Sequence, residues 1–167
     1  MNYQECRAYI DDSAKYGSVL GLDNMREMLD RLGNPQDAVP YVHVAGTNGK
    51  GSCSHTIAAV LQSAGYRVGL FTSPHLVDFR ERIRINGEMT AGRICSQLCR
   101  RTPLILRTAP SSFFELTTAM AFRYFADQKV DVAVIEVGMG GRLDLHQHHS
   151  TPIYVSSLIS VLTTCNI

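Results

Sequence analysis

One short segment of the sequence combines glycines with a lysine in a spacing that suits phosphate binding: Ala45-Gly46-Thr47-Asn48-Gly49-Lys50-Gly51-Ser52. Glycines let the backbone curl so that several N–H groups point at one anion, and a helix that starts directly afterwards adds unpaired N–H donors. Lys50 would bring a full positive charge to the outer phosphates of a nucleotide. The segment therefore predicts a phosphate-binding loop, with a simple strand-to-helix turn as the alternative.

The loop departs from the common P-loop pattern at one position. In that pattern a serine or threonine follows the lysine at once and places its hydroxyl on magnesium. Here Gly51 stands between Lys50 and Ser52. A simple turn would explain the glycines, but it leaves a lysine at the mouth of the helix without a reason.

A second candidate is Glu136, which follows the apolar run Val132-Ala133-Val134-Ile135. A buried carboxylate without a partner costs several kcal/mol, so Glu136 needs a metal ion, a base or a strong hydrogen bond. Magnesium prefers hard oxygen ligands such as a carboxylate. Ion pairing with Arg142 or Lys50 is the structural alternative.

Three further groups of residues admit two interpretations each. Ser73 before Pro74 is either a functional side chain or an ordinary turn serine. The charged run Arg80, Glu81, Arg82 and Arg84 is either a solvated ribbon or a source of arginines for an acidic ligand. The cluster His146, His148 and His149 could bind zinc or nickel, or could be an exposed tail.

Alternating strands and helices must position these residues. We expect strands at 41–45, 67–71, 130–137 and 153–162, and helices at 22–32, 54–64, 91–101 and 113–126, with a looser segment at 72–89. Such alternation predicts an α/β fold with a mostly parallel sheet flanked by helices. Ligands bind at the carboxyl ends of the strands in these folds, and Gly46, Ser73 and Gly138 begin loops there.

Composition narrows the classes of function. The chain has 167 residues and a formal net charge of +1, which argues against a general recruitment of nucleic acid or of an anionic membrane. No apolar run approaches the ~20 residues that span a bilayer, and no signal peptide is evident. Five scattered cysteines favour reduced thiols, which indicates a cytoplasmic protein.

Three ordered segments carry a resemblance to a known family: Gly46 to Ser52, Phe71 to Leu76 with Phe79 to Gly87, and Val134 to Asp144. Together they resemble the folate branch of the Mur ligase superfamily, the folylpolyglutamate and dihydrofolate synthases. Phe113-Phe114-Glu115 with Thr117 fits less specifically. These enzymes join an amino acid to a carboxylate through an acyl phosphate.

The resemblance implies a P-loop-containing domain like the central domain of Mur ligases, with ATP and Mg²⁺ as cofactors. It implies Lys50 and Glu136 as catalytic residues and Ser73 and Glu136 as magnesium ligands. The ATP-binding residues it implies are Gly46, Thr47, Asn48, Gly49, Lys50, Gly51 and Ser52, and those on the folate side are Pro74, His75 and Arg82. The implied partners are small molecules, namely ATP, folate or dihydropteroate, and L-glutamate, and the implied state is a monomer without nucleic acid or membrane.

The resemblance weakens after Asp144. We therefore expect residues 1–144 to form the N-terminal ATP-binding portion, and residues 145–167 to be a divergent tail with one further strand. We also expect the C-terminal ligase domain to be absent and the 167-residue chain alone to be inactive. A non-catalytic nucleotide-binding remnant and another P-loop NTPase remain alternatives. The sequence does not choose between folate and dihydropteroate.

Overall fold

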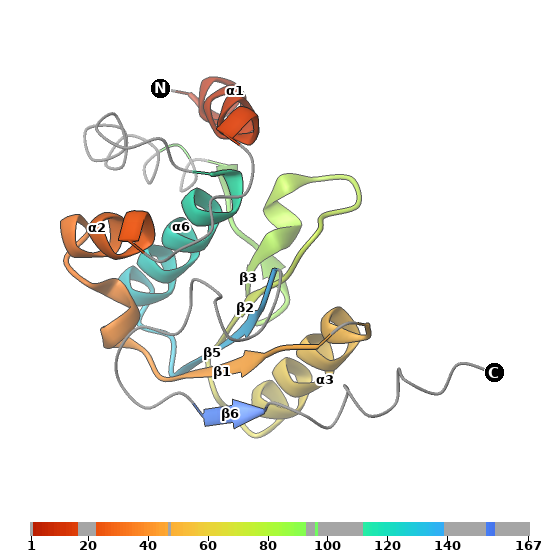
Figure 1. Cartoon of the computed structure of the whole chain (residues 1–167). Helices are drawn as coiled ribbons and strands as arrows, with labels where there is room; N and C mark the ends of the chain where they lie inside the picture. The colour runs from red at the N-terminus through yellow and green to blue at the C-terminus, as the bar shows by residue number, and fades with distance from the viewer. Residues whose placement is uncertain are drawn as a thin grey trace.

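The computed structural model describes residues 2–16, 23–46, 48–92, 96, 112–138 and 153–155, the last group by its backbone (Figure 1). The helices are α1 (Tyr3–Asp12), α2 (Asp23–Arg31), α3 (Lys50–Ser63) and α6 (Phe113–Asp127), with the 3-10 helices η1 (Ser13–Tyr16), η2 (Pro35–Ala38) and η3 (Phe79–Arg82). The strands are β1 (Tyr41–Val44), β2 (Val68–Phe71), β3 (Ile83–Ile85), β4 (Glu88–Met89), β5 (Val132–Glu136) and β6 (Ile153–Val155).

The strands form one sheet in the order β4-β3-β2-β5-β1-β6. Strand β5 runs parallel to both β1 and β2, with Glu136 opposite Val44 and Ile135 opposite Phe71. This register places the carboxyl ends of β1, β2 and β5 side by side at the same end of the sheet. The sheet is mixed, because β3 and β4 are antiparallel to their neighbours. The expected α/β fold is confirmed.

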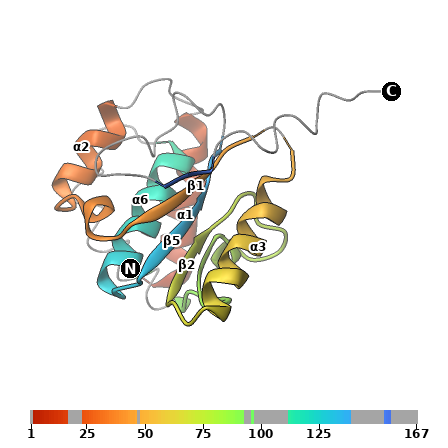
Figure 2. The same cartoon turned by 90° about the horizontal axis from the view of Figure 1, so that it is seen from below.

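Helices cover both faces of the sheet (Figure 2). Helix α3 lies on one face, where it buries a small cluster that includes Val44, Ala58 and Val134. Helix α6 lies on the other face with α1 and α2, over a larger cluster that includes Ile10, Met28 and Phe125. The burial of the strands on both faces explains their nearly continuous apolar sequences.

Helix α6 is the central helix of the larger cluster. It begins with a capping box in which Ser112 and Glu115 satisfy each other's backbone N–H groups. Most of its residues are buried on every side, because the sheet lies against one face and α1 and α2 against another. Its Phe125 ring packs directly on the backbone of Gly69, and a Cβ built there would approach the ring to 2.7 Å.

The segment 72–89 is more regular than its sequence indicates. Asp78 and Glu81 form a capping box that starts η3. Asn86 and Gly87, with φ of 49° and 81°, make the turn between β3 and β4. An Asn-Gly pair is a strong hairpin signal because both residues accept a positive φ. The prediction of a loose segment was therefore wrong.

Helix α1 was not predicted either. A capping box between Asn2 and Glu5 starts it, and Cys6 and Ile10 face the core. Cys6 is disulfide-bonded, so the prediction of reduced thiols is wrong for that residue, whereas Cys53 is a free thiol.

Several predictions lie wholly or partly outside the described residues. They concern the helix at 91–101, Thr47, Arg142, the histidines at 146, 148 and 149, and most of the tail. The last expected strand is present at 153–155, where it pairs with β1.

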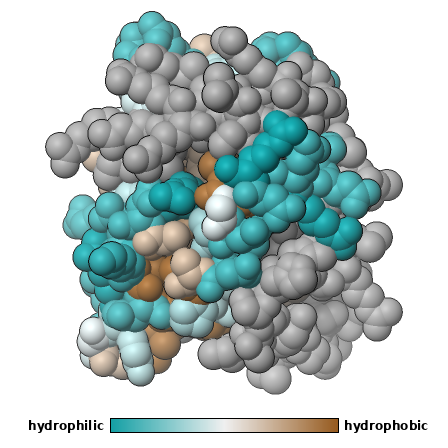
Figure 3. Space-filling model, turned by 90° about the vertical axis from the view of Figure 1, so that its left-hand side faces the viewer, coloured by the Kyte–Doolittle hydropathy of each residue, from teal (hydrophilic) through white to brown (hydrophobic). Residues whose placement is uncertain are grey.

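Among the described helices none is long and apolar enough to cross a membrane. Among the described residues visible on the face that carries α2, hydrophilic ones predominate and surround a hydrophobic area (Figure 3).

Candidate nucleotide and acceptor site

The glycine-rich segment connects β1 directly to α3. Gly49 precedes the helix with φ of 75°, a left-handed conformation that favours glycine. Helix α3 already begins at Lys50, four residues before the predicted start, and no side chain caps it. Its first-turn N–H groups therefore lack the side-chain oxygen that usually accepts from them. This is the arrangement that binds an anion.

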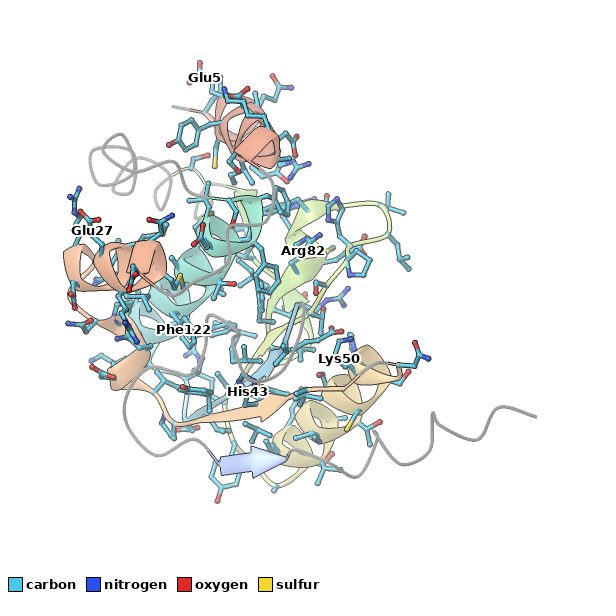
Figure 4. The ribbon with its side chains drawn as sticks, viewed as in Figure 1. Glu5, Glu27, His43, Lys50, Arg82 and Phe122 are labelled. Atoms are coloured by element: carbon cyan, nitrogen blue, oxygen red, sulfur yellow. The ribbon has the colours of Figure 1, made fainter. Side chains whose placement is uncertain are left out.

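Lys50 lies in the first turn of α3, and its side chain folds back over the loop (Figure 4). Its Nζ donates a hydrogen bond to the Gly46 carbonyl oxygen at 2.9 Å. This bond holds the ammonium group near Gly46, at the beginning of the loop. The structure thus supplies both elements of the predicted loop, backbone donors and a cation.

Glu136 ends β5 next to this loop, and its side chain is 3% exposed. Its Oε2 atom accepts a hydrogen bond of 3.0 Å from the backbone N–H of Ser73, which follows β2. A Cβ built on Gly51 would lie 3.7 Å from the same oxygen. Glu136 therefore joins the segment after β2 to the first turn of α3.

Burial raises the pKa of Glu136 above its ordinary value. The hydrogen bond from Ser73 and the positive charges of Lys50, His55 and Arg82 oppose that rise. Lys50 donates a hydrogen bond to the Gly46 carbonyl oxygen, and its positive charge lowers the pKa of Glu136. These groups favour the ionised carboxylate, and a carboxylate oxygen is the hard ligand that a divalent cation such as magnesium takes.

The magnesium ligands expected from the resemblance thus come from adjacent strand ends. Within the described part of the chain no group of three or more His, Cys, Asp or Glu side chains gathers around a common point. A site with one carboxylate fits magnesium nonetheless, because this ion keeps several waters and takes phosphate oxygens as ligands. Glu136 is buried and accepts a hydrogen bond from the Ser73 N–H, and its carboxylate has the oxygen donors that this ion needs.

The folate-side residues lie on the segment that follows β2. The bond between Ser73 and Pro74 is a cis peptide. Arg82 Nε donates to His75 Nδ1 at 2.8 Å, and the guanidinium stacks 5.0 Å from the centroid of the Phe113 ring. Arg82 is 7% exposed, so it does not belong to a solvated ribbon.

Glu81 organises the turn between His75 and η3. Its carboxylate accepts hydrogen bonds from the backbone N–H groups of Leu76, Val77 and Asp78. These bonds lower the pKa of Glu81 to about 2. The side chains of Leu76 and Val77 remain 89% and 92% exposed. Glu81 therefore fixes the backbone of a loop whose apolar tip faces solvent.

We expect Glu81→Gln to lower stability by an amount that depends on pH. A folded-state pKa of about 2, below the ordinary 4.5, means that ionised Glu81 stabilises the fold above about pH 4.5. This contribution is lost as the pH falls through about 2. The difference in melting temperature between wild type and Glu81→Gln should be constant above pH 5 and shrink below pH 4.5.

The matched control is Glu88→Gln, because Glu88 is an exposed carboxylate for which no hydrogen bond is recorded in the described structure. Its melting temperature should differ little from that of the wild type at every pH. If the difference in melting temperature between the wild type and Glu81→Gln stayed the same from pH 7 to pH 2.5, the charge of Glu81 would not contribute to stability as proposed.

Two basic residues near the site were not predicted. His55, one turn into α3, contacts the Gly51 carbonyl oxygen through Nδ1 at 2.8 Å and acts electrostatically on Glu136. Arg7 on α1 lies with its Cζ 4.7 Å from the centroid of the Phe79 ring. His55 could have been noticed from its spacing to the loop, but nothing local to α1 marks Arg7.

A strand, a glycine-rich loop and an uncapped helix beside a buried carboxylate give this α/β domain the architecture of the P-loop class. No protein-family model matches the chain. Among curated relatives, the dihydrofolate synthase/folylpolyglutamate synthase of Bacillus subtilis (strain 168) is 41% identical over 97% of this chain. The folylpolyglutamate synthase of Lacticaseibacillus casei is 41% identical over 98%. This chain spans 38% of the length of each of these two relatives.

Solved structures agree with the sequence matches. The crystal structure of folylpolyglutamate synthase from Thermotoga maritima matches this chain with a TM-score of 0.79 and 42% identity. The match covers 86% of this chain and 34% of the Thermotoga maritima chain. A complex of folylpolyglutamate synthase with AMPPCP matches with a TM-score of 0.82 and 39% identity. This match covers 92% of this chain and 38% of the chain in the complex. The chain is therefore a homologue of the folylpolyglutamate and dihydrofolate synthases over most of its own length.

Proposed function

We propose that this chain carries the nucleotide-binding and acceptor-binding portion of an ATP-dependent ligase that adds L-glutamate to folates, to dihydropteroate, or to both. The observation that carries the proposal is Glu136, a buried carboxylate hydrogen-bonded to Ser73 beside the uncapped first turn of α3. Support also comes from the relatives, which are named for folylpolyglutamate and dihydrofolate synthesis.

The proposed reaction has two steps. A carboxylate oxygen of the acceptor takes the γ-phosphoryl group of ATP, and ADP leaves. The amino group of glutamate then attacks the acyl carbon, phosphate leaves and an amide bond forms. In such phosphoryl transfers the protein mainly positions the reactants and stabilises charge on the phosphate oxygens. The loop N–H groups and the Lys50 ammonium would do so here.

We propose that Ser73 and Glu136 hold magnesium together with the nucleotide. The ion supplies neutralisation of charge on the phosphate oxygens. On the protein side, Glu136 would contribute a carboxylate oxygen, and its bond to the Ser73 N–H keeps that carboxylate at the edge of the sheet. Pro74, His75 and Arg82 would meet the acceptor, because they follow Ser73 on the same side of the candidate site.

Relatives also guide the choice of ligands. One solved neighbour, with a TM-score of 0.80 and 38% identity, is a complex of folylpolyglutamate synthase with AMPPCP and folate. We extend both ligand classes to this chain as part of the proposal. We further propose that the protein works in the cytoplasm as a monomer, on small molecules rather than on nucleic acid or membranes.

The test of the proposed function is magnesium-dependent binding of AMPPCP to the 167-residue chain. Replacing EDTA by Mg²⁺ should tighten binding to the wild type by about tenfold, because the ion links the phosphates to the protein. Glu136→Gln keeps the size of the side chain and an oxygen for the Ser73 N–H, but it removes the charge. This variant should bind AMPPCP with almost the same affinity in Mg²⁺ and in EDTA. Isothermal titration calorimetry measures both affinities.

Glu115→Gln is the matched control, since Glu115 is also a buried carboxylate but serves as the partner of Ser112 at the start of α6. It should retain the magnesium effect. Loss of the effect in both variants, or its retention in Glu136→Gln, would contradict the assignment of Glu136. A wild-type chain that does not bind AMPPCP would contradict the proposed function itself.

A further inference from the structure

Two arginines from distant segments lie against two touching phenylalanine rings. The Arg7 guanidinium lies 4.7 Å from the centroid of Phe79, and that of Arg82 lies 5.0 Å from the centroid of Phe113. The two rings meet edge to face with their centroids 6.2 Å apart. The guanidinium groups therefore occupy neighbouring positions. We refer to Arg7, Phe79, Arg82 and Phe113 as the arginine–phenylalanine cluster.

The donors of this cluster are incompletely used. Arg7 Nη2 pairs with Asp11 Oδ1 at 2.7 Å, but Arg7 Nη1 is buried and has no hydrogen-bond partner among the described residues. Arg82 donates through Nε to His75, a neutral acceptor nitrogen, and no ion pair joins Arg82 to a carboxylate of the described residues. A buried donor without a partner costs about 1–3 kcal/mol, and more when it is charged. The cluster thus has the composition of an anion site.

The two charges also act on each other. Burial lowers the pKa of Arg82, and the positive charge of Arg7 lowers it further. Burial lowers the pKa of His75, and the positive charges of Arg82 and Arg7 lower it further. Mutual repulsion of this kind is relieved when an anion binds between the charges. Asp11, which is half exposed, compensates Arg7 from the outer side of α1.

The cluster adjoins the candidate site. Arg82 contributes to the charges that act on Glu136, and His75 follows Ser73 by two residues. In Figure 4, Arg82 lies between α1 and Lys50. An acceptor whose reactive carboxylate lies near Lys50 and Glu136 would therefore extend toward Arg82 and Arg7.

We propose that Arg7, together with Arg82, binds a second carboxylate of the acceptor, namely the α-carboxylate of a terminal glutamate whose γ-carboxylate reacts. The inference rests on the proposed function and narrows its acceptor. Folates end in a glutamate with two carboxylates, whereas dihydropteroate has only the carboxylate that reacts. Because guanidinium groups bind carboxylates in a bidentate manner, this pair of arginines favours an acceptor of the folate class.

The experiment compares folate with pteroate, which lacks the glutamate, as ligands of the 167-residue chain saturated with AMPPCP and Mg²⁺. The wild type should bind folate more tightly than pteroate by about tenfold or more, as expected for hydrogen bonds to a charged group. Arg7→Gln should remove most of this preference by weakening folate binding, and it should leave the affinities for pteroate and AMPPCP nearly unchanged. Calorimetric titrations report all three.

Three variants separate recognition of the anion from support of the fold. Arg7→Lys keeps the charge and should retain part of the preference for folate. Asp11→Asn removes the partner of Arg7 but leaves its charge, so folate affinity should stay the same or rise. Arg26→Gln changes an arginine on α2 that pairs with Asp23, and it should change nothing.

The inference would be overturned if the wild type bound neither folate nor pteroate, or bound both with equal affinity. It would also be overturned if Arg7→Gln kept the full preference for folate. An equal loss of affinity for folate, pteroate and AMPPCP in Arg7→Gln would contradict it as well. The proposed function is judged separately, because it fails only if AMPPCP binding or its magnesium dependence is missing in the wild type.

Discussion

A chain in which Lys50 is replaced by alanine should bind AMPPCP about 10- to 100-fold more weakly than the wild type. The reason is the loss of a charge-assisted contact to the outer phosphates, which typically contributes about 1.5–3 kcal/mol. The fold should persist, because Lys50 lies in the first turn of α3, outside the two hydrophobic clusters, and its Nζ donates to a loop carbonyl oxygen. Calorimetric titration with AMPPCP measures the loss.

Lys129→Ala provides the matched control. Lys129 is exposed and precedes β5, so it lies at the end of that strand away from Glu136. Its replacement should leave AMPPCP affinity unchanged. If Lys50→Ala bound AMPPCP as tightly as the wild type, or if both variants lost affinity equally, the loop would not use Lys50 for phosphate recognition.

The second large effect concerns stability. Gly69→Ala should lower the free energy of unfolding by about 1–3 kcal/mol, the usual cost of overpacking a core. The added Cβ would lie 2.7 Å from a carbon of the Phe125 ring, and that ring is only 1% exposed and has no room to move. For a chain of this size the melting temperature should fall by about 2–4 °C per kcal/mol. Thermal unfolding followed by circular dichroism measures it.

A second change in the same contact tests the cause. Phe125→Leu should destabilise the wild type by creating space, but it should destabilise Gly69→Ala less, because the smaller side chain accommodates the new methyl group. Gly51→Ala serves as a control for stability, since its added Cβ would meet its nearest described atom at 3.7 Å, an ordinary contact. Strictly additive losses for Gly69→Ala and Phe125→Leu would show that the clash is not the cause.

Local sequence signals were sufficient for the part of the site that is continuous in sequence. The apolar run before Gly46, the glycines and the lysine predicted β1, the loop and α3 in order. Glu136 could be singled out because a carboxylate is rare within an apolar strand. These inferences need only chain periodicity and the chemistry of single residues.

Other parts had usable signals that were given too little weight. Asn86-Gly87 lies between the alternating residues of β3 and β4 and marks the hairpin. The pairs Asn2 with Glu5 and Asp78 with Glu81 have the three-residue spacing of a capping box. Each of these segments is short and carries many charges, so hydrophobic periodicity alone described them poorly.

The burial of Arg82 could not be predicted from the sequence. Its environment is made by Phe113 on α6, by His75 and by Arg7 on α1, which are far apart along the chain. A run of arginines is ordinarily solvated, and only tertiary contacts reverse that expectation. The ring against which Arg7 packs, Phe79, lies in η3, so the position of Arg7 depends on the same long-range contacts.

The place of β5 in the sheet has a consequence for the order of events during synthesis. Strand β5 lies between β1 and β2 although it follows both in sequence. A nascent chain that has emerged only to residue 131 would have β1 and β2 with no strand between them, and two unpaired edges would face each other. Since the amino-terminal part emerges first, affinity for nucleotide should arise abruptly once β5 enters the gap and Glu136 reaches the loop. Before that point, the sheet of the ribosome-bound chain would be incomplete and its unpaired strand edges would be accessible to chaperones.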